Sequence, residues 1–361
     1  MRILFLHKYG RKAASFRYRI EQYLPYFERA GFECEVSSLL DEQYLDERFR
    51  TGRRAPLAII RAAARRLRVL ARVRDFDLVV IGVELFPYVP ALFERAFAAA
   101  GVRFVYDYDD PIFHYYDLSQ RAPVRWLLGG KIGAALKGAA LVFAGSPYLV
   151  EYSRRFNPRV EYLPTVVDLA VYSRTRDFSR ESGAPFTIGW IGSPSTGAYL
   201  AELAPVLRDF ARGRSVRVVV VGAAAGDAKL AGLPVEYRPW SEEREVADLL
   251  GFDVGVMPLT DDAWSRGKCG FKLIQYMACG LPVVASPVGV NREIVVDEVN
   301  GFLASRPHEW ARALERLYDD RQLRARMGAA SRKRVEERYC LAVTAPKFIA
   351  GVEKVLGAAK A

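Results

Sequence analysis

Short, continuous runs of apolar and often β-branched residues alternate along this chain with longer stretches of helical pattern. Strands that are apolar without alternation are buried on both faces, as in a parallel sheet covered by helices. Six such runs in each half indicate an α/β protein with two Rossmann-like, doubly wound parallel-sheet domains facing a cleft. The runs are 2–6, 33–39, 77–83, 103–110, 140–145 and 160–165, followed by 186–193, 216–223, 234–240, 253–259, 281–286 and 301–305.

The length of the chain also favours two domains, because a single core rarely grows beyond about 250–300 residues and this chain has 361. Between the two sets of strands the sequence becomes polar and carries Gly183 and Pro185, as a linker would. We therefore place an N-terminal, acceptor-side domain at 1–170 and a second Rossmann-like domain at 171–335, followed by a C-terminal helix at 336–361.

The charge balance favours an anionic partner. Lys and Arg number 53 against 42 Asp and Glu, a formal net charge of +11. A nucleotide, a nucleic acid or an acidic membrane surface would each suit this excess. No apolar run is long enough for a spanning helix or a signal peptide, so we expect a soluble or peripheral protein.

The cysteines indicate a reducing compartment. None of the four forms a C-x-x-C pair, and no His lies at metal-ligand spacing, so we predict neither a zinc site nor a disulfide framework. We expect reduced thiols and a cytoplasmic protein, either in solution or peripheral at the inner face of the membrane. The four are Cys34, Cys269, Cys279 and Cys340.

A helix flanked by two lysines predicts an anion site in the second half. The helix is expected to begin at about Phe271, after Gly270, so that its free amides and positive dipole end lie beside Lys268 and Lys272. Two ammonium groups and a helix N-terminus together favour a diphosphate. The helix is expected to end at Gly280, before a Leu-Pro pair that cannot continue it.

The loop after the seventh run could receive an anion as well. Gly192, Ser193, Ser195 and Thr196 open the next helix. Glycines and small hydroxyl residues at a helix N-terminus leave backbone amides free for a ligand. The same residue types are also ordinary helix caps, so both interpretations stay open.

Three carboxylates lie at the end of the fourth run, and a histidine follows them. Asp107, Asp109 and Asp110 could supply a general base, an acceptor of sugar hydroxyls or a metal site, with His114 close behind. Alternatively, they cap the next helix and pair with nearby arginines, and His114 is a packed or surface side chain. We select Asp109, Asp110 and His114 as candidate catalytic residues.

The segment 53–74 reads as a basic amphipathic helix. It either docks on anionic lipid or packs on the sheet with its arginines in water. Its basic stripe contains Arg54, Arg61, Arg65, Arg68 and Arg72. Its opposite, apolar side contains Ile59, Ile60, Ala63, Leu67 and Leu70.

The stretch YMACGLPVVASPVGVNREIV and the later NGFLA resemble the donor half of GT-B glycosyltransferases, and most of all glycosyltransferase family 4. LVFAGSPYLVEYSRRF and VEYLPTVVD, in the first half, resemble the interdomain approach of that family. The resemblance implies transfer of a sugar from a nucleotide-sugar donor to a glycan or lipid-linked acceptor, with retention at the anomeric carbon. It implies no metal and no cofactor, and a last helix, after Tyr339, that crosses back to the first domain.

The chain departs from the family at its usual pair of glutamates, and also after GWIG, where SPSTGAY replaces the usual Arg and Lys. Family members usually carry two glutamates eight positions apart, and Gly267 and Gln275 stand at these positions here. The resemblance implies that Gln275 still contacts the donor ribose and that Lys268 and Lys272 stabilise the departing diphosphate. The expected donor-binding residues are Gly192, Ser193, Ser195, Thr196, Lys268, Gly270, Phe271, Lys272 and Gln275.

Two other classes of function compete with this hypothesis. A nucleotide-sugar epimerase on the same fold would bind the donor and need no acceptor. A nucleic-acid-binding protein would use the basic charge, but the chain has no helix-turn-helix, zinc-finger or RNP-like pattern, so no nucleic acid is expected.

Overall fold

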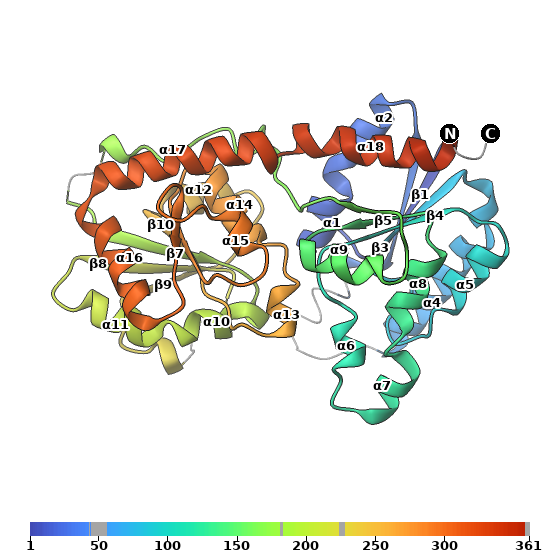
Figure 1. Ribbon diagram of the computed structural model, residues 1–361, viewed down its shortest axis with the longest axis horizontal. Helices are drawn as coiled ribbons and strands as arrows, with labels where there is room; N and C mark the ends of the chain where they lie inside the picture. Colours follow the sequence, from blue (N-terminus) through green and yellow to red (C-terminus); the bar gives the residue numbers. More distant parts are fainter. Residues whose placement is uncertain (43, 45–55, 181–182, 224–227, 358–361) are drawn as a thin grey trace. The chain divides into compact units, whose positions relative to one another are not determined.

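The computed structural model describes residues 1–42, 44, 56–180, 183–223 and 228–357 (Figure 1). It contains two six-stranded sheets, ordered β2-β1-β3-β4-β5-β6 and β12-β11-β10-β7-β8-β9, and every recorded strand pairing is parallel. The predicted class of two doubly wound α/β sheets is therefore confirmed, and each predicted run overlaps one strand. The strands are β1 (Arg2–Tyr9), β2 (Glu33–Leu40), β3 (Leu78–Gly82), β4 (Phe104–Tyr108), β5 (Leu141–Ala144), β6 (Val160–Tyr162), β7 (Phe186–Ile191), β8 (Val216–Val221), β9 (Val235–Arg238), β10 (Val254–Met257), β11 (Val283–Ala285) and β12 (Gly301–Leu303).

Contacts divide the chain into two units. Unit 1 contains Met1–Thr165, Gly267–Cys269 and Thr344–Ala361, and unit 2 contains Val166–Arg266 and Gly270–Val343. The short piece at 267–269 and the last helix thus belong with the N-terminal sheet by their contacts, although they follow the C-terminal strands in sequence.

Unit 1 covers its sheet with helices on both sides (Figure 1). The central strands β1, β3 and β4 are almost entirely buried, as continuous apolar runs require. From the C-terminal end of the chain, Phe348 of α18 inserts among the rings of Tyr23, Phe27 and Phe143. The helices of this part are α1 (Ala14–Arg19), α2 (Leu24–Arg29), α4 (Pro56–Ala71), α5 (Leu92–Ala99), α6 (His114–Asp117), α7 (Ala122–Leu128), α8 (Lys131–Gly138), α9 (Pro147–Arg154) and α18 (Leu341–Gly357).

Unit 2 has the same layered plan around a second apolar core, in which Ile188, Trp190, Val218 and Leu314 are buried. The helix predicted at Phe271 begins there and ends at Ala278, two residues before Gly280. The helices of this unit are α10 (Gly197–Glu202), α11 (Ala204–Ala211), α12 (Glu245–Leu250), α13 (Ala263–Arg266), α14 (Phe271–Ala278), α15 (Asn291–Ile294), α16 (Pro307–Asp319) and α17 (Arg321–Arg338).

The orientation predicted for the 53–74 helix is wrong in part. Ala62, Arg66 and Leu70, spaced by four residues, form the single buried ridge of α4, which packs on β2. This ridge is narrow, so most of the predicted apolar side lies outside it. Ile59, Ile60 and Leu67 are exposed, and Ala63 is half-buried. Arg61, Arg65, Arg68 and Arg72 are exposed as predicted, and Arg54 lies outside the described residues.

None of the four cysteines, all of which lie in the described part of the chain, takes part in a disulfide bond. Within the described ranges, no helix combines the length and the apolar character needed to cross a membrane.

Candidate functional site

The 192–197 loop and the first turn of α14 meet at the carboxyl ends of the strands of unit 2. Gly192 directly follows β7, and Lys272 is the second residue of α14. A Cβ atom built on Gly192 would lie 2.7 Å from Cε of Lys272 and 2.6 Å from the Trp190 ring. The Lys272 ammonium lies 5.6 Å from the centroid of that ring. The structure therefore brings together two residues of the predicted donor-binding set.

The hydroxyl groups of the 192–197 loop bond within the loop. Ser193 Oγ and Ser195 Oγ are 2.9 Å apart, and Thr196 Oγ1 donates to the Ser193 carbonyl at 2.9 Å. A short 3-10 turn, Pro194–Thr196, then leads into α10, and no side-chain cap is recorded at the start of that turn. The structure thus does not support helix capping by Ser193, and the predicted binding of an anion at this loop stays a prediction.

Gly270 determines how the chain enters α14. Its φ is +69°, a left-handed conformation that favours glycine. A Cβ atom there would lie 2.3 Å from Ile294 Cδ1, so the close approach of α15 also requires glycine. Phe271 and Lys272 follow, half-buried, in the first turn of the helix. Lys268 lies in the short 267–269 piece that is grouped with unit 1.

The side chain of Gln275 belongs to a buried hydrogen-bond network. Its Nε2 donates to the Tyr172 hydroxyl at 3.0 Å, and that hydroxyl donates to Glu245 Oε1 at 2.6 Å. Trp240 Nε1 donates to the other carboxylate oxygen of Glu245, also at 2.6 Å. This network was not predicted from sequence, because its members are far apart along the chain. The proposed contact between Gln275 and a donor ribose stays a prediction.

The carboxylates around the end of β4, in unit 1, have different environments. Asp107 lies within the strand and pairs with the buried Arg19, whose Nε donates to Asp107 Oδ2 at 3.1 Å. Arg19 also donates through Nη1 to the Leu163 carbonyl at 2.6 Å. For Asp107, the alternative of pairing with an arginine is therefore the one observed.

Asp109 has the environment of a proton-exchanging group. It is 8% exposed and accepts a hydrogen bond from Thr165 Oγ1 at 3.0 Å. Burial, reinforced by repulsion from Asp110, raises its pKa to about 7. Near neutral pH this carboxyl group can hold or release a proton, which a general acid or base requires. Asp110, the next residue, is half-buried.

Both ring nitrogens of His114 have partners. Nδ1 lies 2.8 Å from Asp117 Oδ1, and Nε2 lies 2.9 Å from the Tyr148 hydroxyl. These contacts hold the ring between α6 and Tyr148 of α9, as expected of a packed histidine. Its assignment as a catalytic residue is not tested by these contacts.

Sequence reasoning missed a buried charged cluster after β3. Glu84 accepts hydrogen bonds from Lys131 Nζ and the Tyr116 hydroxyl, both at 2.6 Å, and from Lys8 Nζ at 3.0 Å. Burial opposes its ionisation, but these three groups together lower the pKa of Glu84 below its ordinary value. The available signal was a glutamate that stands two residues after a fully apolar strand. Val83, just before it, has a φ of +73°, which is strained for a β-branched residue.

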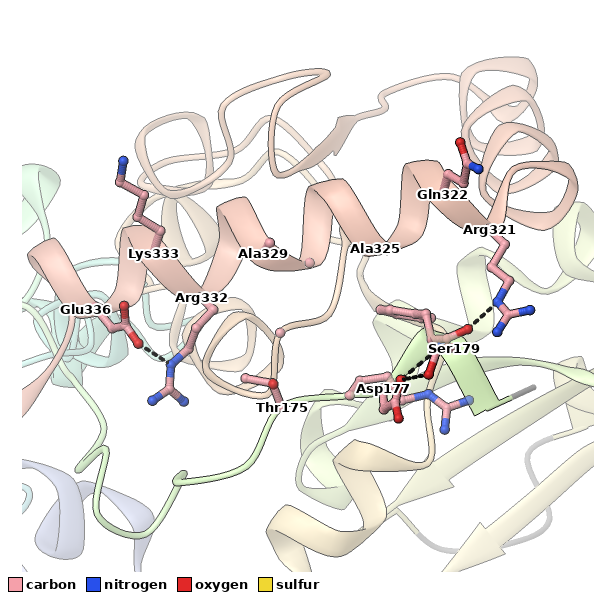
Figure 2. Close-up of a pocket in the computed structure, with 14 residues that line it drawn as sticks. Thr175, Asp177, Ser179, Arg321, Gln322, Ala325, Ala329, Arg332, Lys333 and Glu336 are labelled. Carbon is pink, nitrogen blue, oxygen red and sulfur yellow. Dashed lines mark hydrogen bonds and ion pairs between the residues drawn. The ribbon is translucent and has the colours of Figure 1, made fainter.

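A cavity of about 750 Å³ lies elsewhere in unit 2, between α17 and the segment 175–179 (Figure 2). Gly280, in its wall, precedes β11, so the cavity lies toward the amino ends of the strands and not at the Gly192–Lys272 end. Its arginines have partners: Arg332 Nε pairs with Glu336 at 2.7 Å, and Arg176 Nη2 pairs with Asp253 at 3.0 Å. We therefore do not assign the donor to this cavity. Among the described residues, no group of three or more His, Cys, Asp or Glu is placed to hold a metal ion.

Comparison with known proteins matches the fold of the chain to solved structures and one part of its sequence to a family of proteins. Residues 186–320 match the family described as glycosyl transferases group 1. The chain is 31% identical over 219 residues to the D-inositol 3-phosphate glycosyltransferase of Paenarthrobacter aurescens, covering 53% of this chain and 52% of the relative. It therefore spans about half the length of the curated relatives it matches.

Solved structures match nearly the entire chain. Sucrose-phosphate synthase from Thermosynechococcus elongatus aligns with a TM-score of 0.69 at 14% identity, covering 99% of each chain. Anabaena HepE in complex with UDP-glucose also aligns with a TM-score of 0.69, at 17% identity, covering 98% of this chain and all of that one. At these identities the likeness shows the shared fold.

Proposed function

We propose that this protein transfers a sugar from a nucleotide-sugar donor to a glycan or lipid-linked acceptor. It has the GT-B fold, and its residues 186–320 match the group 1 glycosyl transferase family. The observation that carries the proposal is the placement of Lys272 against Gly192 and Trp190 at the carboxyl ends of the strands. In parallel α/β sheets this end of the strands is where ligands bind.

Lys272 suits the diphosphate of such a donor. Its ammonium lies in the first turn of α14, where backbone amides and the helix dipole also favour negative charge. When the bond between the anomeric carbon and the diphosphate oxygen breaks, charge develops on that oxygen, and a positioned cation stabilises it. The HepE structure, a complex with UDP-glucose, supports a nucleotide-sugar donor for this chain. Lys268 is the second proposed cation.

Asp109 is the group best suited to the acceptor side of the reaction. As the acceptor hydroxyl oxygen forms its bond to the anomeric carbon, its proton must leave. A carboxyl group with a pKa of about 7 can take that proton. The proposal includes retention at the anomeric carbon and independence of metal ions, with Asp110 and His114 as further candidates beside Asp109. Gln275 would contact the donor ribose.

The acceptor class proposed here differs from the one in the names of the relatives. The matching curated proteins are named D-inositol 3-phosphate glycosyltransferases. For this chain we propose a glycan or lipid-linked acceptor. Cysteines without disulfide bonds suit a reducing compartment, so the proposal includes a cytoplasmic location.

Thermal unfolding with a panel of nucleoside diphosphates and their sugars tests the donor site. A ligand that binds only the folded state stabilises it by about 2.7 kcal/mol at a hundredfold excess over Kd, so the melting temperature should rise with concentration. The Lys272→Ala variant should lose most of this rise in melting temperature, and the Lys268→Ala variant should show a smaller rise than the wild type. Lys333→Ala is the matched control, because that exposed lysine lines the α17 cavity instead.

If the nucleotide-induced rise in melting temperature were undiminished in Lys272→Ala, or lost in Lys333→Ala, the donor would bind elsewhere. Incubation of the donor alone separates the competing activity, because an epimerase would produce an isomerised nucleotide sugar without any acceptor.

A further inference from the structure

Large apolar side chains are exposed on three segments of unit 1 that lie far apart in sequence. They come from the start of α4, from the segment between β3 and the first residue of α5, and from α7. Trp126 is the extreme case, with 85% of its surface exposed. We call this set the apolar rim, and it consists of Leu57, Ile60, Tyr88, Leu92, Trp126 and Leu127.

The topology of the sheet puts these segments at one edge. β2, β3 and β4 all run parallel to β1 or to one another, so their carboxyl ends point the same way. The start of α4 follows β2, the Tyr88 segment follows β3, and α6 and α7 follow β4. Direct contacts join the Tyr88 segment to α6, the helix that precedes α7. The Tyr88 amide donates to the Tyr116 hydroxyl at 3.2 Å, and the centroids of the two rings lie 5.7 Å apart.

The base of the α6–α7 excursion is firmly anchored, although its tip is exposed. Lys131, the first residue of α8, donates to Glu84 Oε2 and to the Phe86 carbonyl, each at 2.6 Å. On the other side, Phe113 stacks on Tyr152 with ring centroids 3.5 Å apart and planes within 4°. Figure 1 shows α6 and α7 projecting from the rest of unit 1. The fold thus holds Trp126 outward on a well-packed support.

The exposed charges around the rim are basic. In the described segments 56–61, 83–95 and 110–130, every fully exposed charged side chain is an arginine. The carboxylates of the same segments are buried, as are Glu84 and Glu94, or half-buried, as are Asp110 and Asp117. The exposed arginines are Arg61, Arg95, Arg121 and Arg125.

We propose that the apolar rim docks on the surface of an anionic lipid bilayer, with Trp126 and Leu127 entering the interfacial region. Tryptophan and tyrosine favour the boundary between headgroups and acyl chains, and arginine pairs with acidic headgroups. A second copy of the chain fits the rim less well, because a twofold contact would set the same arginines against themselves.

The surface shares only Arg61 with the arginine stripe predicted on the 53–74 helix. Two members of that stripe already have carboxylate partners, since Arg65 pairs with Asp41 at 2.8 Å and Arg72 with Glu35 at 3.1 Å. Asp109 and Asp110 follow β4 at the same edge of the sheet as the rim. If the proposed glycosyl transfer holds, on which this step rests, the docked rim brings those carboxyl groups to an acceptor carried by lipid.

Vesicle flotation tests the docking directly. The full chain is mixed with vesicles of phosphatidylcholine alone or of equal phosphatidylcholine and phosphatidylglycerol, at low and high NaCl. Binding is expected to the anionic vesicles and to weaken with salt. The Trp126→Ser/Leu127→Ser double variant should lower the partition coefficient at least about tenfold, because two large apolar side chains no longer leave water. Arg121→Gln/Arg125→Gln should weaken binding and reduce its salt dependence.

Val171→Ser/Val299→Ser is the matched control, because it removes two exposed apolar side chains from unit 2 and should leave vesicle binding unchanged. Absence of binding to anionic vesicles, or binding unaffected by the Trp126 variant, would overturn the proposal. So would a dimer in light scattering that depends on Trp126 and does not bind vesicles. The nucleotide-induced rise in melting temperature, measured on the same variants, reports separately on the donor site and on folding.

Discussion

The fold moves the pKa of the Asp109 carboxyl group into the pH range in which the proposed reaction would take place. Its folded pKa is about 7, against about 3.9 for an unperturbed aspartate. Between these values the folded state holds a proton that the unfolded state has released. The protonated carboxyl therefore contributes stability that is fully present below about pH 4 and is lost as the pH rises through about 7.

Asp109→Asn should remove this pH dependence. Asparagine is neutral at every pH and keeps an oxygen to accept from Thr165 Oγ1. We expect the variant to gain stability over the wild type as the pH rises from 5 to 8, by about 1–3 kcal/mol at pH 8. Urea unfolding across that range measures the difference. Asp209→Asn, at an exposed aspartate, is the control and should show a pH-independent difference.

The same variant tests the proposed chemistry. If Asp109 accepts the acceptor's proton, Asp109→Asn should lose transfer activity while keeping the nucleotide-induced rise in melting temperature. A stability difference that does not grow with pH would show that the carboxyl group is not held protonated by its surroundings.

The residue pairs of the interior could not be predicted from the sequence. Arg19 meets Asp107 from 88 positions away, and Lys131 meets Glu84 from 47 positions away. Each charge was visible in the sequence, but only the fold determines which of many charged residues becomes its partner. The pKa of Asp109 depends on its burial and on repulsion from Asp110. Of these two causes, the sequence shows only the neighbouring Asp110.

At the scale of elements, the strands were the most predictable feature and the packed face of α4 the least. A continuous apolar run such as 78–82 can be buried on both faces only in the centre of a parallel sheet, so its pattern determines its environment. The sequence of an alanine-rich helix such as α4 does not determine in the same way which of its faces is buried. Its contact with β2 uses the ridge of Ala62, Arg66 and Leu70, with Arg66 Nη2 donating to the His7 carbonyl at 2.7 Å.

The junction between β7 and α14 offers a test at this scale. Gly192→Ala would place a Cβ atom 2.7 Å from Lys272 Cε and against the fixed Trp190 ring, so the lysine must move. We expect nucleotide affinity to fall about tenfold, which corresponds to about 1.4 kcal/mol, with a smaller effect on stability. Titration calorimetry with the best nucleotide of the thermal panel measures this.

Gly197→Ala is the matched control in the same loop. The nearest side-chain atom to its new Cβ would be Ala223 Cβ at 3.7 Å, an ordinary contact, and Gly197 already lies at the start of a helix. Its affinity should be unchanged. Equal losses in the two variants would mean that the loop backbone, and not the position of Lys272, governs binding.

At the scale of the whole molecule, the last helix completes the core of the first unit. Phe348 is fully buried, with ring centroids 5.2, 5.1 and 4.8 Å from those of Tyr23, Phe27 and Phe143. The Thr344 hydroxyl lies 2.8 Å from that of Tyr23. The N-terminal sheet therefore packs against residues that follow the whole of unit 2 in the sequence.

Phe348→Ala should consequently weaken unit 1 and spare unit 2. Truncating a buried phenylalanine lowers the free energy of unfolding by about 3–5 kcal/mol, and hydrogen exchange with mass spectrometry resolves where the loss falls. Peptides from β1, β3 and β5 should exchange faster, while those from β7, β8 and β10 keep their protection. Phe210→Ala, which removes a ring packed on Phe186 and Tyr318 in unit 2, should give the reverse pattern. Equal loss of protection in both units from either variant would mean that the two sheets unfold as one cooperative body, so that the C-terminal helix stabilises the entire chain instead of one half.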